Sequence, residues 1–195
     1  WEIFAFANAE LVGDGVYRLS SLLRGLGGET HLAARGLAAG ATFVLLDEAV
    51  TPLVSGLSRV GAQNAWRVGP ADRDHADAAC VSFESVATSK ALMPYAPSRL
   101  RARRSAEGVT FTVLRRGRRD GDSWDLVEIP LGEDSEAYDL EILRNGAVVR
   151  VLSGAQAAIL YPANLEAADF GGQQGAFDLR AYQMSAAVGR GFVLN

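Results

Sequence analysis

Alternation of apolar and polar residues is the main pattern in this chain, and it is clearest from Tyr138 to Ser153. Asn145-Gly146 separates two alternating runs there, and this dipeptide favours a two-residue type I′ turn because both central residues need positive φ. The short loop also predicts the register, with Glu141 facing Arg150 on the polar face. The predicted apolar face comprises Tyr138, Leu140 facing Val151, and Ile142 facing Val149. Such a hairpin is half-buried and needs a second sheet to cover it.

Further alternating or short apolar runs predict strands along the whole chain. In the first half they cover residues 1–7, 11–12, 16–19, 42–46, 66–69 and 80–86. In the second half they cover residues 99–103, 109–113, 159–162 and 177–182. The run at 42–46 is entirely apolar after its threonine, which predicts a buried strand. Helical composition is confined to residues 29–39. The fold class is therefore predicted to be mainly β.

Pro94 and Pro97 mark the expected boundary between two domains. They stand in the stretch TSKALMPYAP, which is polar and then interrupted by proline. Prolines this close together stiffen an extended linker and remove backbone donors. We expect two β-rich domains, one over residues 1–91 and the other over residues 92–195.

Composition narrows the class of protein further. The chain has 195 residues, of which 49% are hydrophobic and 22% charged, and this is the balance of a folded globular protein. A net charge of −4 argues against a general nucleic-acid binder. A single cysteine, Cys80, excludes an internal disulfide, and two histidines are too few for a zinc site built from protein ligands alone. No apolar run reaches the ~20 residues of a membrane span. The strand-like run at Trp1 suggests a piece of a longer protein.

Candidate catalytic and metal-binding groups are sparse. Asp47-Glu48 provides the two carboxyl groups that sugar hydrolysis uses, but neighbours on a strand point to opposite faces. Residues 72–77 hold three aspartates and His75, which could bind a metal or form an exposed loop; the loop is favoured because nothing orients the side chains. Residues 120–125 resemble a calcium loop but lack the glycine at its sixth position and the closing bidentate glutamate. Neither histidine stands beside a serine or a cysteine. We expect no enzymatic activity, cofactor or metal.

Arginine is the most concentrated charge in the chain. Eight arginines lie between Arg99 and Arg119, and the loop after residue 114 reads RRGRRDGD. Such a patch could bind phosphate or an acidic glycan, or it could be a solvated edge with local ion pairs. Stacked nucleic-acid bases would need exposed aromatic residues, and Phe111 points inward in the predicted alternation. The residues expected to contact a partner are Arg115, Arg116, Arg118, Arg119, Asp122 and Trp124.

The second half of the chain, from Pro97 to Phe192, resembles a fibronectin type III module. The resemblance is carried by the proline before the first strand, the central alternating hairpin, and a late strand followed by Gly189-Arg-Gly191. It implies that residues 92–195 form a β-sandwich of the immunoglobulin or fibronectin type III-like class, built from two antiparallel sheets. Two positions depart from the family: Phe177 stands where a tyrosine-corner hydroxyl is usual, and Leu114 where a core tryptophan is common.

The whole chain is also similar to the C-terminal part of the large baseplate or tail-tip protein of phage-like gene transfer agents. The similar stretches are FANAELVGDGVYRLSSLLRGLGG, AAGATFVLLDEAV, WRVGPA, PYAPSRLRARR, DGDSWDLVEIPLGE and YQMSAAVGRGF. The resemblance implies a non-enzymatic structural and adhesion module of a virion-like tail tip, made in the bacterial cytoplasm. Its expected partners are other tail and baseplate proteins, sister subunits and cell-surface polysaccharide. The alternative function is a carbohydrate-binding or carbohydrate-active domain.

Overall fold

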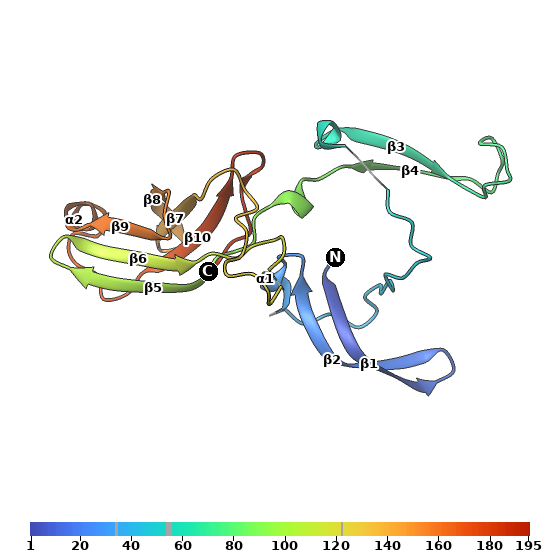
Figure 1. Cartoon of the computed structure of the whole chain (residues 1–195), viewed down its shortest axis with the longest axis horizontal. Helices are drawn as coiled ribbons and strands as arrows, with labels where there is room; N and C mark the ends of the chain where they lie inside the picture. The colour runs from blue at the N-terminus through green and yellow to red at the C-terminus, as the bar shows by residue number, and fades with distance from the viewer. Residues whose placement is uncertain (34, 54–55, 122) are drawn as a thin grey trace. The chain divides into compact units, whose positions relative to one another are not determined.

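The computed structural model describes residues 1–33, 35–53, 56–121 and 123–195. The chain is built from antiparallel sheets with short helices between them, so the mainly β prediction is confirmed (Figure 1). It forms two compact units, one comprising Trp1–Leu37 with Met93–Asn195 and the other Ala38–Leu92. The first 37 residues thus group with the C-terminal part of the chain. The division into domains 1–91 and 92–195 stays a prediction.

The larger unit contains a β-sandwich. One sheet has the order β5-β6-β9 and the other β11-β10-β7-β8. The bounds are β5 Ser98–Ser105, β6 Gly108–Leu114, β7 Tyr138–Arg144, β8 Ala147–Gly154, β9 Ala158–Pro162, β10 Asp178–Ser185 and β11 Gly189–Arg190. A three-stranded sheet facing a four-stranded one, with the chain passing repeatedly between them, is the arrangement of immunoglobulin and fibronectin type III-like domains. The core between them is formed by Val109, Phe111, Val113, Tyr138, Leu140, Ile142, Ile159, Tyr161 and Ala181.

The central hairpin has the predicted turn but not the predicted register. Asn145 and Gly146 both have positive φ, at 54° and 78°, as a type I′ turn requires. The ladder then shifts by one residue after Leu143, so that Leu140 faces Leu152 and Glu141 faces Val151.

A bulge in β8 causes this difference. Ile142 pairs with Arg150 while Leu143 pairs with Val148, which leaves Val149 as the extra residue. An extra residue turns every later side chain to the other face of the sheet. Val149 and Val151 are accordingly 37% and 44% exposed, so placing them on the buried face was wrong. Arg150 faces inward instead, and its guanidinium binds the carboxylate of Asp169.

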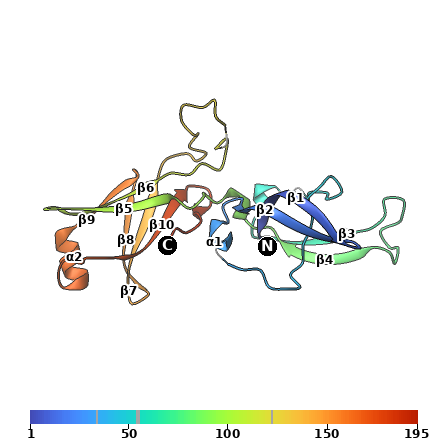
Figure 2. The ribbon, with the colours of Figure 1, turned by 90° about the horizontal axis from the view of Figure 1, so that it is seen from below.

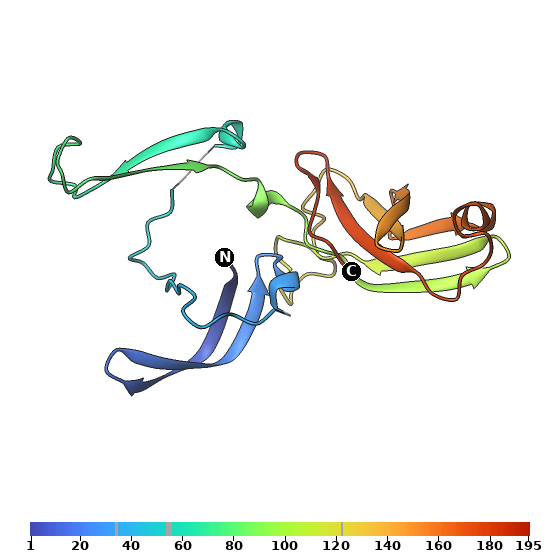
Figure 3. The ribbon, with the colours of Figure 1, turned by 180° about the vertical axis from the view of Figure 1, so that it is seen from behind.

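Helix α2, Ala163–Phe170, lies beside β9 at one end of the sandwich (Figure 3). The sequence patterns missed this helix because its apolar residues show little helical periodicity. It ends at Gly171, which has the left-handed conformation that commonly closes helices. Tyr161, fully buried on β9, donates its hydroxyl hydrogen to Asp169 Oδ2 at 2.6 Å. Phe177, at the position where a tyrosine-corner hydroxyl is usual, packs edge-on against the rings of Phe111 and Tyr161.

The N-terminal hairpin belongs to the same unit and pairs β1, Ile3–Gly13, with β2, Val16–Leu26. The glycine-rich stretch at its end is a packing loop. Gly28 has φ of 91°, and a side chain there would lie 2.6 Å from the Tyr95 ring and 2.8 Å from the Phe192 ring. Helix α1, Thr30–Ala33, follows within the predicted helical region.

The smaller unit contains one two-stranded sheet, of β3, Gln63–Val68, and β4, Val81–Val86, with 3-10 turns at Leu57–Arg59 and Lys90–Leu92. The buried strand predicted at residues 42–46 is absent: this segment has no strand structure and Phe43 to Leu46 are each about half exposed or more. An apolar run becomes a strand only beside a partner strand, and β3 and β4 pair only with each other in the described part of this unit.

Candidate functional site

The loop from residue 115 to 137 connects β6 to β7 and projects from the sandwich (Figure 2). Two of its arginines hold its outgoing and returning segments together. Arg115 Nη2 donates to Glu128 Oε1 at 3.0 Å and to the Ile129 carbonyl at 2.7 Å. Arg118 Nε donates to Glu133 Oε1 at 2.9 Å. Both arginine side chains are largely covered, with 17% and 16% exposed, so the loop is internally cross-linked.

A third arginine anchors the base of the loop. The Arg116 guanidinium lies 5.4 Å from the centre of the Tyr95 ring, within range of a cation–π interaction. The Arg116 backbone N–H donates to Gln183 Oε1 at 2.6 Å, and the Gln183 amide donates back to the Arg116 carbonyl at 2.9 Å. Because Gln183 is buried on β10, this pair of bonds ties the loop to the sandwich.

The outer surface of the loop is more apolar than its sequence suggested. Trp124 is 99% exposed, Val127 is fully exposed and Leu126 is 45% exposed. Of the other residues expected to contact a partner, Arg119 is exposed and Asp122 lies outside the described residues. That these residues contact a partner stays a prediction. Leu126 and Val127 were missed, although their apolar side chains in a charged loop were a readable signal.

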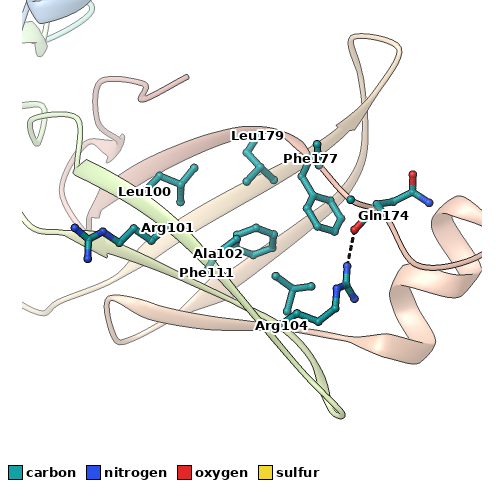
Figure 4. A pocket seen from close by; sticks show the side chains of 11 residues that line it. Leu100, Arg101, Ala102, Arg104, Phe111, Gln174, Phe177 and Leu179 are labelled. Carbon is teal, nitrogen blue, oxygen red and sulfur yellow. Dashed lines mark hydrogen bonds between the residues drawn. The ribbon is translucent and has the colours of Figure 1, made fainter.

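A pocket of about 310 Å³ opens beside β5, between the two sheets (Figure 4). Its floor is apolar and comes from both sheets, with Leu100 and Ala102 on β5, Phe111 on β6, Phe177 directly before β10, and Leu179 on β10. Sequence reasoning missed the pocket because it depends on contacts between strands far apart in the chain.

An ion pair closes one end of this pocket. Arg104 makes two bonds of 2.8 Å to the two oxygens of Glu166, a fully buried residue of α2. It also donates to the Gln174 carbonyl at 2.7 Å, and the Gln174 N–H donates to Glu166 at 2.6 Å (Figure 4). The hydrogen bonds from Arg104 hold the pKa of the Glu166 carboxyl below its ordinary value. Arg104 is therefore a structural cation, neutralised by its partner.

A second structural pair joins the bulged strand to the helix. Arg150 Nε and Nη2 donate to Asp169 at 2.5 and 2.7 Å, and the Tyr161 hydroxyl shares one of these oxygens. The hydrogen bonds from Arg150 lower the pKa of the Asp169 carboxyl. Burial, reinforced by the bond to Asp169, raises the pKa of the Tyr161 hydroxyl. These groups satisfy one another and leave no free acid or base.

The face of the four-stranded sheet that points away from the core carries a third charged network. Arg190 on β11 donates to Asp139 Oδ2 at 2.9 Å and also pairs with Glu141, both on β7. The Arg190 guanidinium stacks 4.8 Å from the centre of the Tyr182 ring. The hydrogen-bonding partners of Glu141 thus come from its neighbours on the sheet, and the Arg150 partner predicted for it is wrong.

The remaining candidate groups show local structural roles. Asp47 accepts a hydrogen bond from the Ala49 N–H at 3.0 Å, and Asp74 and Asp77 likewise stabilise turns. Trp66 stacks on Phe83 and donates to Ser85. Among the described residues, no group of three His, Cys, Asp or Glu side chains could hold a metal ion. None of the helices in the described ranges is long and apolar enough to cross a membrane.

Comparisons with known proteins give a partial family match. No curated protein matches the chain. A crystal structure of the rat CD45 extracellular region, domains d3-d4, aligns over 96% of this chain and 90% of that chain, with 10% identity and a TM-score of 0.36. The sandwich is assigned from its own strand order. Residues 1–44 match the family model described as Rcc01698-like, C-terminal, so the N-terminal hairpin, α1 and the segment after it are similar to that family.

Proposed function

We propose that this chain is a non-enzymatic structural and adhesion module of a phage-like tail-tip or baseplate protein. It is made in the bacterial cytoplasm and incorporated into the particle, where it contacts other tail and baseplate proteins, sister subunits and cell-surface polysaccharide. The family match over residues 1–44 supports this proposal, because it covers the first of the stretches that resemble the gene transfer agent protein and the beginning of the second.

The observation that carries the proposal is the loop between β6 and β7. Its tip presents Trp124 and Val127 to solvent, and its sides are cross-linked by Arg115 and Arg118. A loop whose sides are cross-linked loses less conformational entropy on binding, and tryptophan is enriched among the residues that contribute most to binding at interfaces. The arginines thus hold the loop in place, and the apolar tip makes the contact.

The proposal is tested in the strain that encodes the parent protein. Immunogold labelling with antibodies against this chain should mark the tail tip of purified particles. Labelling confined to the cytoplasm or to another part of the particle would refute the tail-tip assignment. Particles carrying Trp124→Ala should then show weaker tail assembly or weaker adsorption to host cells.

Val151→Ala is the control, because Val151 is also an exposed apolar residue but lies on β8 and not on the loop. It should leave particle assembly and adsorption unchanged. If Trp124→Ala particles assemble and adsorb like the wild type, the loop tip is not the contact surface.

Binding of carbohydrate is the second candidate function, and the exposure of the Trp124 ring favours it. An exposed tryptophan offers both an apolar face and an N–H donor to a ligand. Titration of the purified chain with cell-surface polysaccharide should then give binding that Trp124→Ala abolishes. We expect no release of reducing sugar; turnover lost on changing Asp47 or Asp122 to alanine would show an enzyme instead.

A further inference from the structure

We propose that the free edge of β5 binds an extended acidic segment of a partner protein as an added strand, with one apolar side chain of that segment inserted in the neighbouring pocket. This edge carries different residues from the loop tip at Trp124, so it extends the proposed function and can fail or stand independently of it.

The backbone of β5 is available for such pairing. β5 stands at the end of its sheet and pairs only with β6. Among the described residues, no further backbone hydrogen bond is made by residues 98–105. The strand is eight residues long, and residues 101–105 are exposed. An exposed edge strand is a template for an incoming extended chain.

Charge restricts what this edge accepts. Arg99, Arg101 and Arg103 have no acidic partner among the described residues, in contrast to Arg104, which is neutralised by Glu166. Arg101 extends away from the pocket floor (Figure 4), and alternation along the strand places Arg103 on the same outer face. The guanidinium groups repel a second β5 edge from another copy and attract carboxylates placed opposite them. The edge is therefore selective for an acidic strand.

The pocket supplies the second element of recognition. It lies on the inner side of the same strand, where Leu100 and Ala102 point, and its deeper wall is formed by Phe111 and Phe177. Its volume of about 310 Å³ is at the small end of ligand pockets, which suits a single large apolar side chain. In an added strand successive side chains alternate between the two faces. The chemistry that fits is thus an acidic residue, an apolar residue and an acidic residue in sequence.

The test uses the full chain and a fluorescein-labelled peptide of sequence EVEFEVE, with binding followed by fluorescence anisotropy. Three further peptides separate the contributions of charge, apolar side chains and backbone pairing. KVKFKVK reverses the charge, and ETETETE removes the apolar side chains. Backbone N-methylation of EVEFEVE blocks strand pairing while keeping the charges and the apolar side chains. We expect EVEFEVE alone to bind, with affinity that falls as salt is raised.

Protein variants locate the site. Arg101→Glu combined with Arg103→Glu should weaken EVEFEVE binding about tenfold or more, because attraction is replaced by repulsion at two positions. Arg119→Glu, the same type of charge reversal at a single exposed residue of the loop, is the control and should have little effect, and Arg101→Glu alone, with the same change in net charge, should still weaken binding. Circular dichroism of each variant checks that the fold is retained, and amide hydrogen exchange should show new protection at residues 98–105.

Three results would overturn the inference. They are absence of EVEFEVE binding at millimolar concentration, equal binding of the N-methylated or lysine peptide, and protection that appears on the loop or on β8 instead of β5. None of these results bears on whether the parent protein lies at a tail tip, which the immunogold experiment decides separately.

Discussion

Replacing Leu140 with alanine should strongly destabilise the sandwich, whereas replacing Val151 should not. Leu140 is 2% exposed and lies in the core cluster. The carbons removed are worth about 2.4 kcal/mol at about 0.8 kcal/mol per methylene, and the cavity left behind brings the expected loss to about 2–5 kcal/mol. Val151 is 44% exposed, so Val151→Ala should remove less than about 1 kcal/mol.

The comparison tests the bulge, since a regular hairpin would place Val151 directly opposite Leu140 on the buried face. Because the chain has two compact units, amide hydrogen exchange of the β7 residues is the suitable assay, as it reports the opening free energy of the sandwich itself. Urea unfolding followed by circular dichroism should show the same ranking with unchanged m values. If Val151→Ala cost as much as Leu140→Ala, the register shift at Val149 and the outward face of β8 would both be wrong.

Three further outcomes are expected. Gly28→Ala should destabilise the larger unit by about 1–3 kcal/mol, because its φ is positive and two rings occupy the space, while Gly36→Ala, with nothing within 4 Å, should be nearly neutral in the same urea titration. Arg104 lowers the pKa of Glu166 from 4.5, so the contribution of this carboxylate to stability is present above about pH 4.5 and is lost as pH falls through the lowered pKa. In Glu166→Gln the urea midpoint should therefore depend less on pH below about 4.5. Trp124→Ala should leave the melting temperature unchanged, and a drop of several degrees would show that its ring packs against the fold.

Local features could be predicted from the sequence with good success. Alternating residues formed strands at β6, β7 and β10, and Asn145-Gly146 formed the predicted turn. These features depend on a few neighbouring residues: a strand shows its two faces in its own sequence, and a turn with positive φ needs residues that tolerate it. The alternating runs predicted the mainly β class, and the resemblance to fibronectin type III modules predicted the β-sandwich.

Relations between distant residues were decided only by the tertiary structure. The bulge at Val149 turns Arg150 inward, where it binds Asp169. No pattern in the hairpin sequence indicates an extra residue. The apolar run at 42–46 stays exposed because it has no partner strand among the described residues of its unit.

The arginines show most clearly which properties the sequence determines and which depend on the tertiary structure. The sequence by itself determined that they cluster, but an arginine is a free cation or a structural cross-link according to which carboxylate folds beside it. Arg118 finds Glu133 15 residues away and Arg104 finds Glu166 62 residues away, whereas Arg101 and Arg103 find none among the described residues. Because an ion pair forms only at contact distance, this choice depends on how the chain folds back on itself, and the tertiary structure alone assigned each arginine its role.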